Sequence, residues 1–440
     1  MATASLERTT STAPTLTTKA TISYWCKRGR MSGWNNGAIA GGHDSGNTAN
    51  NNWQCGFIDT DKFYLWNNGV SMNLVSTRRA RDTNAWYHVV WSLDSTQGTA
   101  ADRAKLYVNG EQVTVFDTSN YPTQNGLFDM ARNGNSFRVG KYINTSGNNY
   151  YFDGQLAHFH FVDGTAYPAS TFGETDATTG IWKPKASPSG VSYGTNGFFL
   201  RFDNSANMGL DSSGQSNNWT TSGTIIQNKD TPSNVFNTLS PIDIPIAGTS
   251  TAGTLPTLSN ANTSITNSNS AFREIRSNIY VTKGKYYFEA KPTRIGGSGA
   301  FQVGVQLRNY SSGSGERRAY QNNGYKYTPG SASYGASYAA NDVVGVALNL
   351  TDGEITFYKN GVSQGVAATD MLSGMDNIGW TAAASCYDAD AHFNFGNGYF
   401  GTTAVSSAQN PDDGIGIFEY DPPTGYKALC TKSINAQEYS

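Results

Sequence analysis

The sequence predicts an all-β protein made of two β-sandwich modules in series, joined by a proline-rich connector and followed by a C-terminal docking tail. Short segments in which large residues alternate with small or polar ones recur along the chain, separated by Gly, Asn, Asp and Pro. Helical periodicity is hard to find anywhere. In addition, one hairpin pattern occurs once in each half, at residues 104–116 and again at 353–366.

Both hairpins are predicted from the same dipeptide, Asn109-Gly110 in one and Asn360-Gly361 in the other. Asn-Gly supplies the two positive-φ residues of a type I′ turn, whose twist matches that of paired antiparallel strands. The sequences around the two hairpins do not align at any fixed period. We therefore interpret them as two unrelated hairpins that use the same type of turn, and not as an internal repeat.

Composition excludes several classes of protein. The chain has 440 residues, a length that suits two or three domains. Only 15% of the residues are charged and the net charge is −2, so no broad basic surface for nucleic acid is expected. No apolar run approaches the roughly 18 residues of a membrane span, so no membrane insertion is expected. The 21 Phe, 25 Tyr and 9 Trp residues supply ample material for cores.

The first module is expected to occupy residues 1–225. In HVVWSL and LAHFHFV large residues alternate with polar or small ones, which predicts strands with one packed and one solvated face. The expected strand segments are ATISYWCKR, WQCGFIDTDKFYLWNN, AWYHVVWSL, RAKLYVNGEQVTVF, FRVGKY, FDGQLAHFHFVDG and GFFLRF.

A connector at 226–256 is predicted from its prolines and its lack of core-type runs. Its apolar residues Val235, Phe236, Leu239 and Ile242 could dock on a neighbouring element. The second module is expected at 257–400, and its strand segments are NIYVTKGKYYFEAKP, GAFQVGVQL, NDVVGVALNLTDGEITFYKNGVSQGVA, MDNIGWTAAASC and DADAHFNFGN. Residues 401–440 read as a tail, with Tyr420, Tyr426 and Leu429 as its anchors.

The four cysteines are Cys26, Cys55, Cys386 and Cys430, and no C-x-x-C pair occurs among them. This spacing does not indicate a zinc ribbon. A disulfide between Cys26 and Cys55 within the first module remains possible, and buried free thiols are an equal alternative.

Two stretches resemble known modules. WYHVVWSLD, AKLYVNG and FDGQLAHFHFVDGTA, within residues 20–202, resemble the strands of a concanavalin-A-like or laminin-G-like jelly roll. GKYYFEA, FQVGV, NDVVGVALNLTDGEITFYKNGV and AHFNFGN, within 270–400, resemble a SPRY domain in their order.

A third resemblance covers most of the chain. GTAYPASTFGETDATTGIWKPK, GFFLRFDNSANMGLDSSGQSNNW, DTPSNVFNTLSP and FEYDPPTGYKALCTK are similar to phrases in structural proteins of marine tailed bacteriophages. The resemblance implies a non-enzymatic virion protein of a tail fibre, appendage or capsid decoration. It also implies docking to other virion proteins, a homo-oligomer or many copies per particle, and contact with a host-surface glycan or protein. A free carbohydrate-binding lectin and a glycan-cleaving enzyme of the jelly-roll fold are the alternatives.

The virion assignment agrees with the N-terminal sequence. MATASLERTTSTAPTLTTKA contains no apolar core of a secretory signal. We therefore expect synthesis in the host cytoplasm, with release by another route such as lysis.

Catalytic chemistry is not indicated by the sequence. Glycosidases of this fold need two closely spaced carboxylates, as in E-x-D-x-E, and no such run occurs. Asp59 with Asp61 is the strongest spacing match, and a hairpin turn explains it better. Asp388 with Asp390 is interpreted as a polar edge or turn.

Metal binding has two sets of candidates. His158 and His160 are spaced to share one strand face, but no third ligand is near in the sequence, and an outer solvated face explains them better. Loop carboxylates of jelly-roll lectins often bind Ca²⁺, and the corresponding weak candidates are Asp94, Asp102 and Asp163. No other cofactor is expected.

Glycan or protein recognition is expected from aromatic and Arg side chains on loops, which give large contact area at low entropy cost. The first choice is the Gly/Ser-rich stretch 308–325, and the second is a set of rings in the first module. These candidates are Arg308, Tyr310, Arg317, Arg318, Tyr320, Tyr325, Trp34, Trp53, Trp66, Tyr150 and Tyr151.

Overall fold

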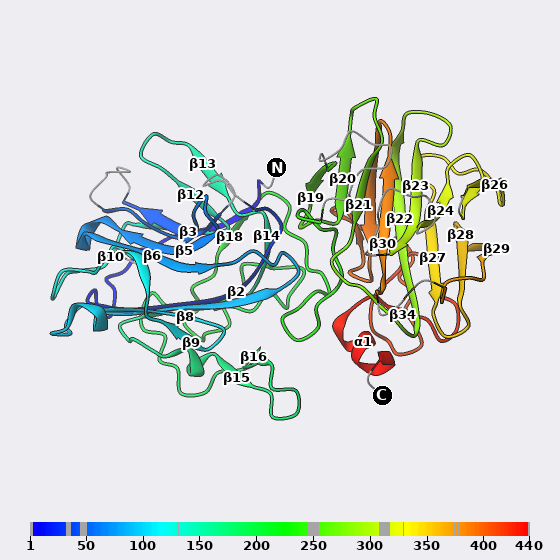
Figure 1. Ribbon diagram of the computed structural model, residues 1–440. Coiled ribbons are helices and arrows are strands. Elements are labelled where there is room, and N and C mark those ends of the chain that lie inside the picture. The colour runs from blue at the N-terminus through cyan, green and yellow to red at the C-terminus, as the bar shows by residue number, and fades with distance from the viewer. Residues whose placement is uncertain are drawn as a thin grey trace. The chain divides into compact units, whose positions relative to one another are not determined.

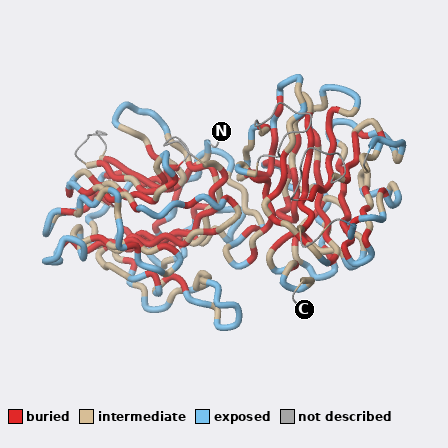
Figure 2. The backbone as a smooth tube through the Cα atoms, viewed as in Figure 1, coloured by how far each residue is buried: buried red, intermediate tan, exposed pale blue. Residues whose placement is uncertain are grey.

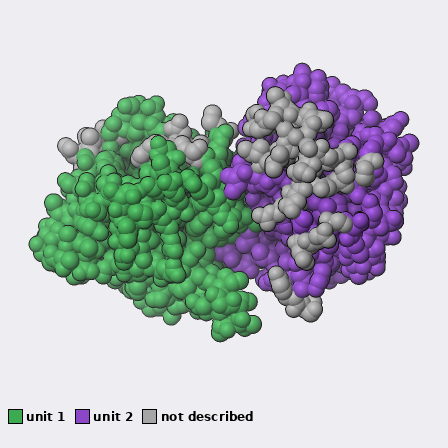
Figure 3. Space-filling view, in the orientation of Figure 1, with its two compact units in different colours: residues 1–227 green, residues 228–440 purple. Residues whose placement is uncertain are grey.

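The computed structural model describes residues 3–31, 37–44, 51–130, 132–243, 255–307, 317–328, 330–373, 375 and 378–438. The chain divides into two compact units, residues 1–227 and 228–440 (Figure 3). Each unit contains two main antiparallel sheets whose facing sides are buried (Figures 1 and 2). The predicted fold class, all-β with two sandwiches in series, is confirmed.

The larger sheet of the first unit has eight strands in the order β10-β6-β5-β4-β3-β11-β1-β18. In this order the strands span Phe116–Asn120, Met72–Arg79, Lys62–Asn67, Trp53–Phe57, Ala38–His43, Ser136–Val139, Ser5–Thr9 and Thr220–Ser222. Alternate side chains of the sheet point into the sandwich, where Trp53 packs edge-on against Phe137 with ring centroids 4.6 Å apart.

The smaller sheet of the first unit runs β17-β14-β2-β7-β8-β9. Its strands span Phe198–Leu200, Gly154–Asp163, Lys19–Arg28, Trp86–Asp94, Ala104–Val108 and Glu111–Val113. Two hairpins add to the unit: β12 (Lys141–Ile143) with β13 (Asn149–Tyr151), and β15 (Gly173–Thr175) with β16 (Trp182–Pro184). Short 3₁₀ turns lie at η3 (Asn68–Val70), η4 (Ala100–Asp102) and η5 (Ala169–Thr171).

The outer face of this smaller sheet is covered, so the predicted solvated face of β14 is wrong. Phe172 and Tyr193, from the chain that follows β14, pack over the strand in a second apolar cluster. His160 lies beneath them, 1% exposed, and its Nδ1 is 2.8 Å from the Tyr193 hydroxyl. His158 sits at an irregularity in the β14–β2 pairing with φ 47°. The alternating pattern could not reveal a cover supplied by a later segment.

The second unit repeats the sandwich with different strands. Its larger sheet runs β19-β20-β31-β22-β27-β28-β29, with β34 (Lys427–Ala428) parallel to β22. These seven strands span Thr257–Ser259, Ser264–Asn267, Ala389–Asn394, Lys285–Ile295, Val344–Asn349, Glu354–Lys359 and Val362–Ala368. The smaller sheet, β21-β30-β23-β24-β25-β26, spans Arg273–Arg276, Trp380–Cys386, Phe301–Leu307, Arg317–Gln321, Tyr325–Tyr327 and Ser331–Ser333.

The C-terminal part of the chain packs on the outer face of this larger sheet. Phe418 and Ala428 form an apolar cluster with Tyr287 of β22 and Ala347 of β27. A two-stranded ribbon, β32 (Tyr399–Phe400) with β33 (Thr403–Ala404), precedes this segment, and helix α1 (Thr431–Glu438) ends it.

Both predicted Asn-Gly turns have the expected geometry. Asn109 and Gly110 have φ of 52° and 84°, and Asn360 and Gly361 have φ of 48° and 78°. Each asparagine also anchors its hairpin to the strand before it. Asn109 exchanges two 2.8 Å hydrogen bonds with the backbone of His88, and Asn360 does the same with Val343.

All four cysteines are buried free thiols, which decides between the two alternatives left open by the sequence. Burial raises the pKa of the Cys55 thiol to about 12 and also raises that of Cys26. Neither is therefore a ready nucleophile near neutral pH. No helix among the described residues is long and apolar enough to cross a membrane.

Candidate functional site

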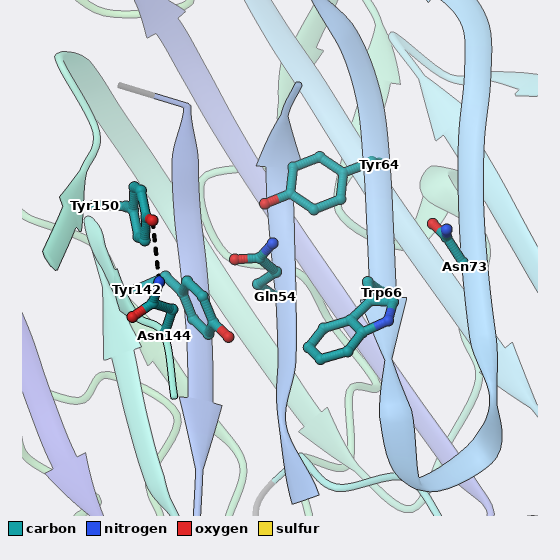
Figure 4. Close-up of a pocket in the computed structure, with 7 residues that line it drawn as sticks. All are labelled: Gln54, Tyr64, Trp66, Asn73, Tyr142, Asn144 and Tyr150. Carbon is teal, nitrogen blue, oxygen red and sulfur yellow. Dashed lines mark hydrogen bonds between the residues drawn. The ribbon is translucent and has the colours of Figure 1, made fainter. Parts of the chain in front are cut away.

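A pocket lies on the outer face of the larger sheet in the first unit, which is the face that points away from the core (Figure 4). Its volume is about 380 Å³, and it opens to solvent. The side chains that line it are Gln54, Tyr64, Trp66, Asn73, Tyr142, Asn144 and Tyr150.

The floor of the pocket is a row of side chains across three neighbouring strands. Gln54 of β4 is in register with Trp66 of β5, which is in register with Asn73 of β6. Neighbouring residues along these strands, such as Trp53 and Leu65, point into the core, so the row points outward. The side chains of Gln54 and Asn73 have no hydrogen-bond partner within the described part of the chain. Their amides are available to a ligand.

A glycine next to the row makes space for the wall. Gly41 of β3 is in register with Gln54, and a Cβ atom at Gly41 would lie only 2.6 Å from Cδ2 of Tyr142. The missing side chain therefore lets the Tyr142 ring approach the sheet surface. Burial, together with nearby Tyr150, raises the pKa of Tyr142 to about 12, so its hydroxyl is neutral at ordinary pH.

The wall itself is the β12–β13 hairpin. The rings of Tyr142 and Tyr150 stack with centroids 6.2 Å apart and planes 21° from parallel. Asn144 Nδ2 donates a 3.1 Å hydrogen bond to the Tyr150 hydroxyl, as Figure 4 shows. Asn144 Oδ1 accepts from the backbone N–H groups of Ser146 and Asn148. Because the Tyr150 oxygen accepts a hydrogen bond there, its own proton can point to a ligand.

Two of the sequence-predicted residues are brought together here, Trp66 and Tyr150. Tyr151 is on the same hairpin but does not line the pocket, and Lys141 Nζ lies 5.3 Å from its ring centroid. Trp53 corrects the prediction: it is not a loop residue but lies in β4, fully buried, because it occupies an inward position of the strand. Trp34 lies outside the described residues.

The first-choice stretch of the second module is not a recognition loop where it is described. Tyr320 lies in β24 and is fully buried in the core, and Arg318 is 5% exposed and paired with Asp370 at 2.6 Å. Arg317 is half-buried and pairs with Glu274 at 2.8 Å. The guanidinium groups of Arg317 and Arg318 are therefore both paired with carboxylates. Burial excludes Arg318 and Tyr320 as exposed contacts. Tyr325, on β25, is 43% exposed.

Arg308 and Tyr310 of the same stretch lie outside the described residues.

The calcium candidates are occupied by protein donors. Asp94 accepts from Thr96 and Gln97 and pairs with Lys19 at 3.2 Å. Asp102 pairs with Lys105 at 3.0 Å. No group of three or more His, Cys, Asp or Glu side chains in the described chain could hold a metal ion.

The third candidate, Asp163, accepts hydrogen bonds from the backbone N–H groups of Thr15 and Asn196. It therefore fastens the N-terminal segment and the chain after β16 to the end of β14. This is a structural use of the carboxylate.

The paired carboxylates considered for catalysis are held by arginines. Asp61 is in the β4–β5 turn with φ 65°, is 5% exposed, and pairs with Arg28 at 3.0 Å and Arg81 at 3.1 Å. Asp388 and Asp390 both pair with Arg294 at the start of β31. The turn interpretation is confirmed for Asp61 and for Asp388, which precedes β31. It is wrong for Asp390, which lies within β31 and is paired on both sides, with β20 and β22.

Sequence reasoning missed the other five residues of the pocket, which are Gln54, Tyr64, Asn73, Tyr142 and Asn144. A partial signal was present, because Tyr64 and Trp66 alternate with the apolar Phe63 and Leu65 and so occupy the outward face. The rest of the pocket is assembled by strand register and by the approach of the β12–β13 hairpin. Neither of these can be recognised from a local sequence pattern.

Comparison with known families places both units. The model of the concanavalin A-like lectin/glucanase superfamily, of laminin G type, matches residues 3–171, and a SPRY-domain model matches 285–398. Among solved structures, the chain is similar to the crystal structure of the SPRY domain of human HERC1. The identity is 18%, the match covers 30% of this chain and 87% of that one, and the TM-score is 0.27. The chain thus carries a concanavalin A-like, laminin G-type domain followed in series by a SPRY domain.

Proposed function

We propose that this chain is a non-enzymatic structural protein of a tailed-bacteriophage virion, in a tail fibre, an appendage or a capsid decoration. We further propose that the pocket of its first domain contacts a glycan of the host surface. The virion setting is supported by the resemblance of several sequence phrases to structural proteins of tailed phages. Binding as the activity is supported by the kinds of domain present.

The observation that carries the binding part is the chemistry of the pocket lining. Trp66, Tyr142 and Tyr150 provide ring faces, and Gln54 and Asn73 provide planar amides without partners. The volume of about 380 Å³ lies in the range of small-ligand pockets. Aromatic faces suit the C–H face of a sugar ring, and amides suit neighbouring hydroxyl groups, since each amide offers both a donor and an acceptor.

The same lining supports a non-catalytic role. Glycoside hydrolysis generally needs two carboxyl groups on either side of the scissile bond. No Asp or Glu is among the lining residues that the structure describes. Asp61, the strongest alternative, is locked between two arginines in a turn.

In this proposal the chain works in many copies, as a homo-oligomer or as repeated subunits docked on other virion proteins. A single small pocket that opens to solvent gives weak contacts on its own. Many copies on one particle convert such contacts into stable attachment through effective concentration. Synthesis takes place in the host cytoplasm.

The test is antibody-gold labelling of purified particles in electron micrographs. Label on the tail or on projecting fibres is the expected result and supports host attachment. Label spread over the head supports a capsid decoration instead. Particles without label, alongside free protein in the lysate, would overturn the virion role and leave a free lectin.

A further inference from the structure

We infer that the pocket takes an uncharged disaccharide unit, laid across the strands with one pyranose ring stacked on Trp66. This inference rests on the proposed glycan contact and specifies its ligand class. It is carried by the cross-strand row on the pocket floor, by the pairing of Arg138 and Lys141 with Glu7, and by the orientation of the wall tyrosine.

The row has an apolar centre and two polar ends. Trp66 stands between Gln54 and Asn73 in the β4–β5–β6 register. Neighbouring strands are about 4.8 Å apart, so the two amides are about 10 Å apart, with the indole between them. A pyranose lying on the indole presents its hydroxyl groups sideways, toward amides on either side. Two linked rings are needed to reach from Gln54 or Tyr150 to Asn73.

Charge selects against acidic sugars. None of the described residues that line the pocket is charged. Two cations beside the row and on the hairpin are already paired: Arg138, in register with Gly41, and Lys141 both pair with Glu7, at 3.5 and 3.0 Å. Arg138 is also 8% exposed and 2.9 Å from His43. A carboxylate or sulfate group on the sugar would lose water without gaining a counter-charge.

The β12–β13 hairpin that forms the wall adds one hydrogen-bond donor, the Tyr150 hydroxyl, which can point toward the ligand. Tyr150 accepts from Asn144 and so offers its proton to the ligand. Tyr151, the next residue, contacts Lys141 outside the pocket, which makes it a matched control on the same short hairpin.

The experiment uses the full-length chain and measures binding by saturation-transfer NMR and titration calorimetry. The neutral probes are cellobiose, maltose, lactose and N,N′-diacetylchitobiose, and the anionic probes are 3′-sialyllactose and digalacturonic acid. We expect at least one neutral probe to bind, with affinity unchanged by EDTA, and the anionic probes to bind at least tenfold more weakly. Trp66→Ala should weaken the neutral binding at least tenfold, while Tyr151→Ala should leave it unchanged within twofold.

Binding only of the anionic probes would overturn the inference, and so would binding of none of the probes. Equal loss in Trp66→Ala and Tyr151→Ala, with both variants folded by circular dichroism, would also overturn it. Tyr150→Phe removes only the hydroxyl and is expected to weaken binding about threefold to tenfold if Trp66→Ala proves unstable. Each of these failures leaves the virion role to be decided by gold labelling, which does not depend on the ligand.

Discussion

The larger sheets of the two domains differ in what covers their outer faces. In the first domain the outer face bears the row of Gln54, Trp66 and Asn73, which opens into a pocket. In the second domain the corresponding face bears Tyr287 and Glu289, which are 1% and 0% exposed under the C-terminal segment of the chain. One architecture therefore presents an open face with a pocket in one domain and a closed face in the other. Cover, and not fold, determines which face can bind.

The covered face is also held by a buried carboxylate. Glu289 accepts hydrogen bonds of 2.9 Å from the backbone N–H groups of both Glu419 and Tyr420, and a third from Asn394. Burial raises the pKa of Glu289 to about 7. The C-terminal segment is thus fastened by polar groups as well as by apolar packing.

The largest expected effect comes from uncovering the second domain. Phe418→Ala removes the ring that packs edge-on against Tyr287, with centroids 5.0 Å apart, and leaves a cavity under the segment. We expect the free energy of unfolding of the second domain to fall by about 3 kcal/mol or more. Urea unfolding measures this, with Phe272→Ala, whose side chain is 36% exposed, as the control. Equal losses in the two variants would mean that the segment does not cover the sheet.

The next effect is the pH dependence of the covered face. The folded protein keeps the Glu289 proton up to about pH 7, and the unfolded chain releases it near the usual 4.5. Between these values the folded state binds more protons, so this group's contribution to stability falls as pH rises, by up to about 3 kcal/mol.

Glu289→Gln cannot ionise and should remove this decline. Urea midpoints at pH 5 and pH 8 test this in the wild type and the variant. Other groups also titrate between pH 5 and pH 8. The quantity to compare is therefore the change in stability of the wild type minus the change in stability of Glu289→Gln. Glu111→Gln, at an exposed strand position in the first domain, should leave the decline in place. An equal decline in wild type and Glu289→Gln would contradict the assigned cause.

The Asn-Gly hairpins should respond alike in the two domains, since both use one anchoring device. Asn109→Ala and Asn360→Ala each place alanine at positive φ and leave a backbone N–H without its side-chain acceptor. We expect each to lower the free energy of unfolding of its own domain by about 2 kcal/mol. Asn→Gly at each position keeps the turn and loses only the acceptor, so it should cost about half as much. A large loss in one domain beside none in the other would show that the hairpins are not equivalent.

The sequence was informative where the structure depends on local pattern. Alternation predicted the strands, and Asn-Gly predicted both turns, because neighbouring residues determine these features. It failed where distant segments meet. Trp53 and Trp66 were both candidates for a ring that contacts a ligand. Only the face of the sheet to which each side chain points separates the buried Trp53 from Trp66, which lines the pocket. The cover over His160 and the contribution of Tyr142 come from later segments, whose positions no local pattern specifies.

The smallest expected effect on stability is that of Trp66→Ala. The side chain lies on the open face without a hydrogen-bond partner in the described chain, so its loss should change the free energy of unfolding of the first domain by only about 0.5 kcal/mol. Urea unfolding of this variant, beside Phe418→Ala, compares the open face directly with the covered one. A loss this small would support the proposed binding role of Trp66, because packing would then not account for a large ring on this face. A loss of about 2 kcal/mol or more would instead make Trp66 part of the packing, and the two faces would no longer differ.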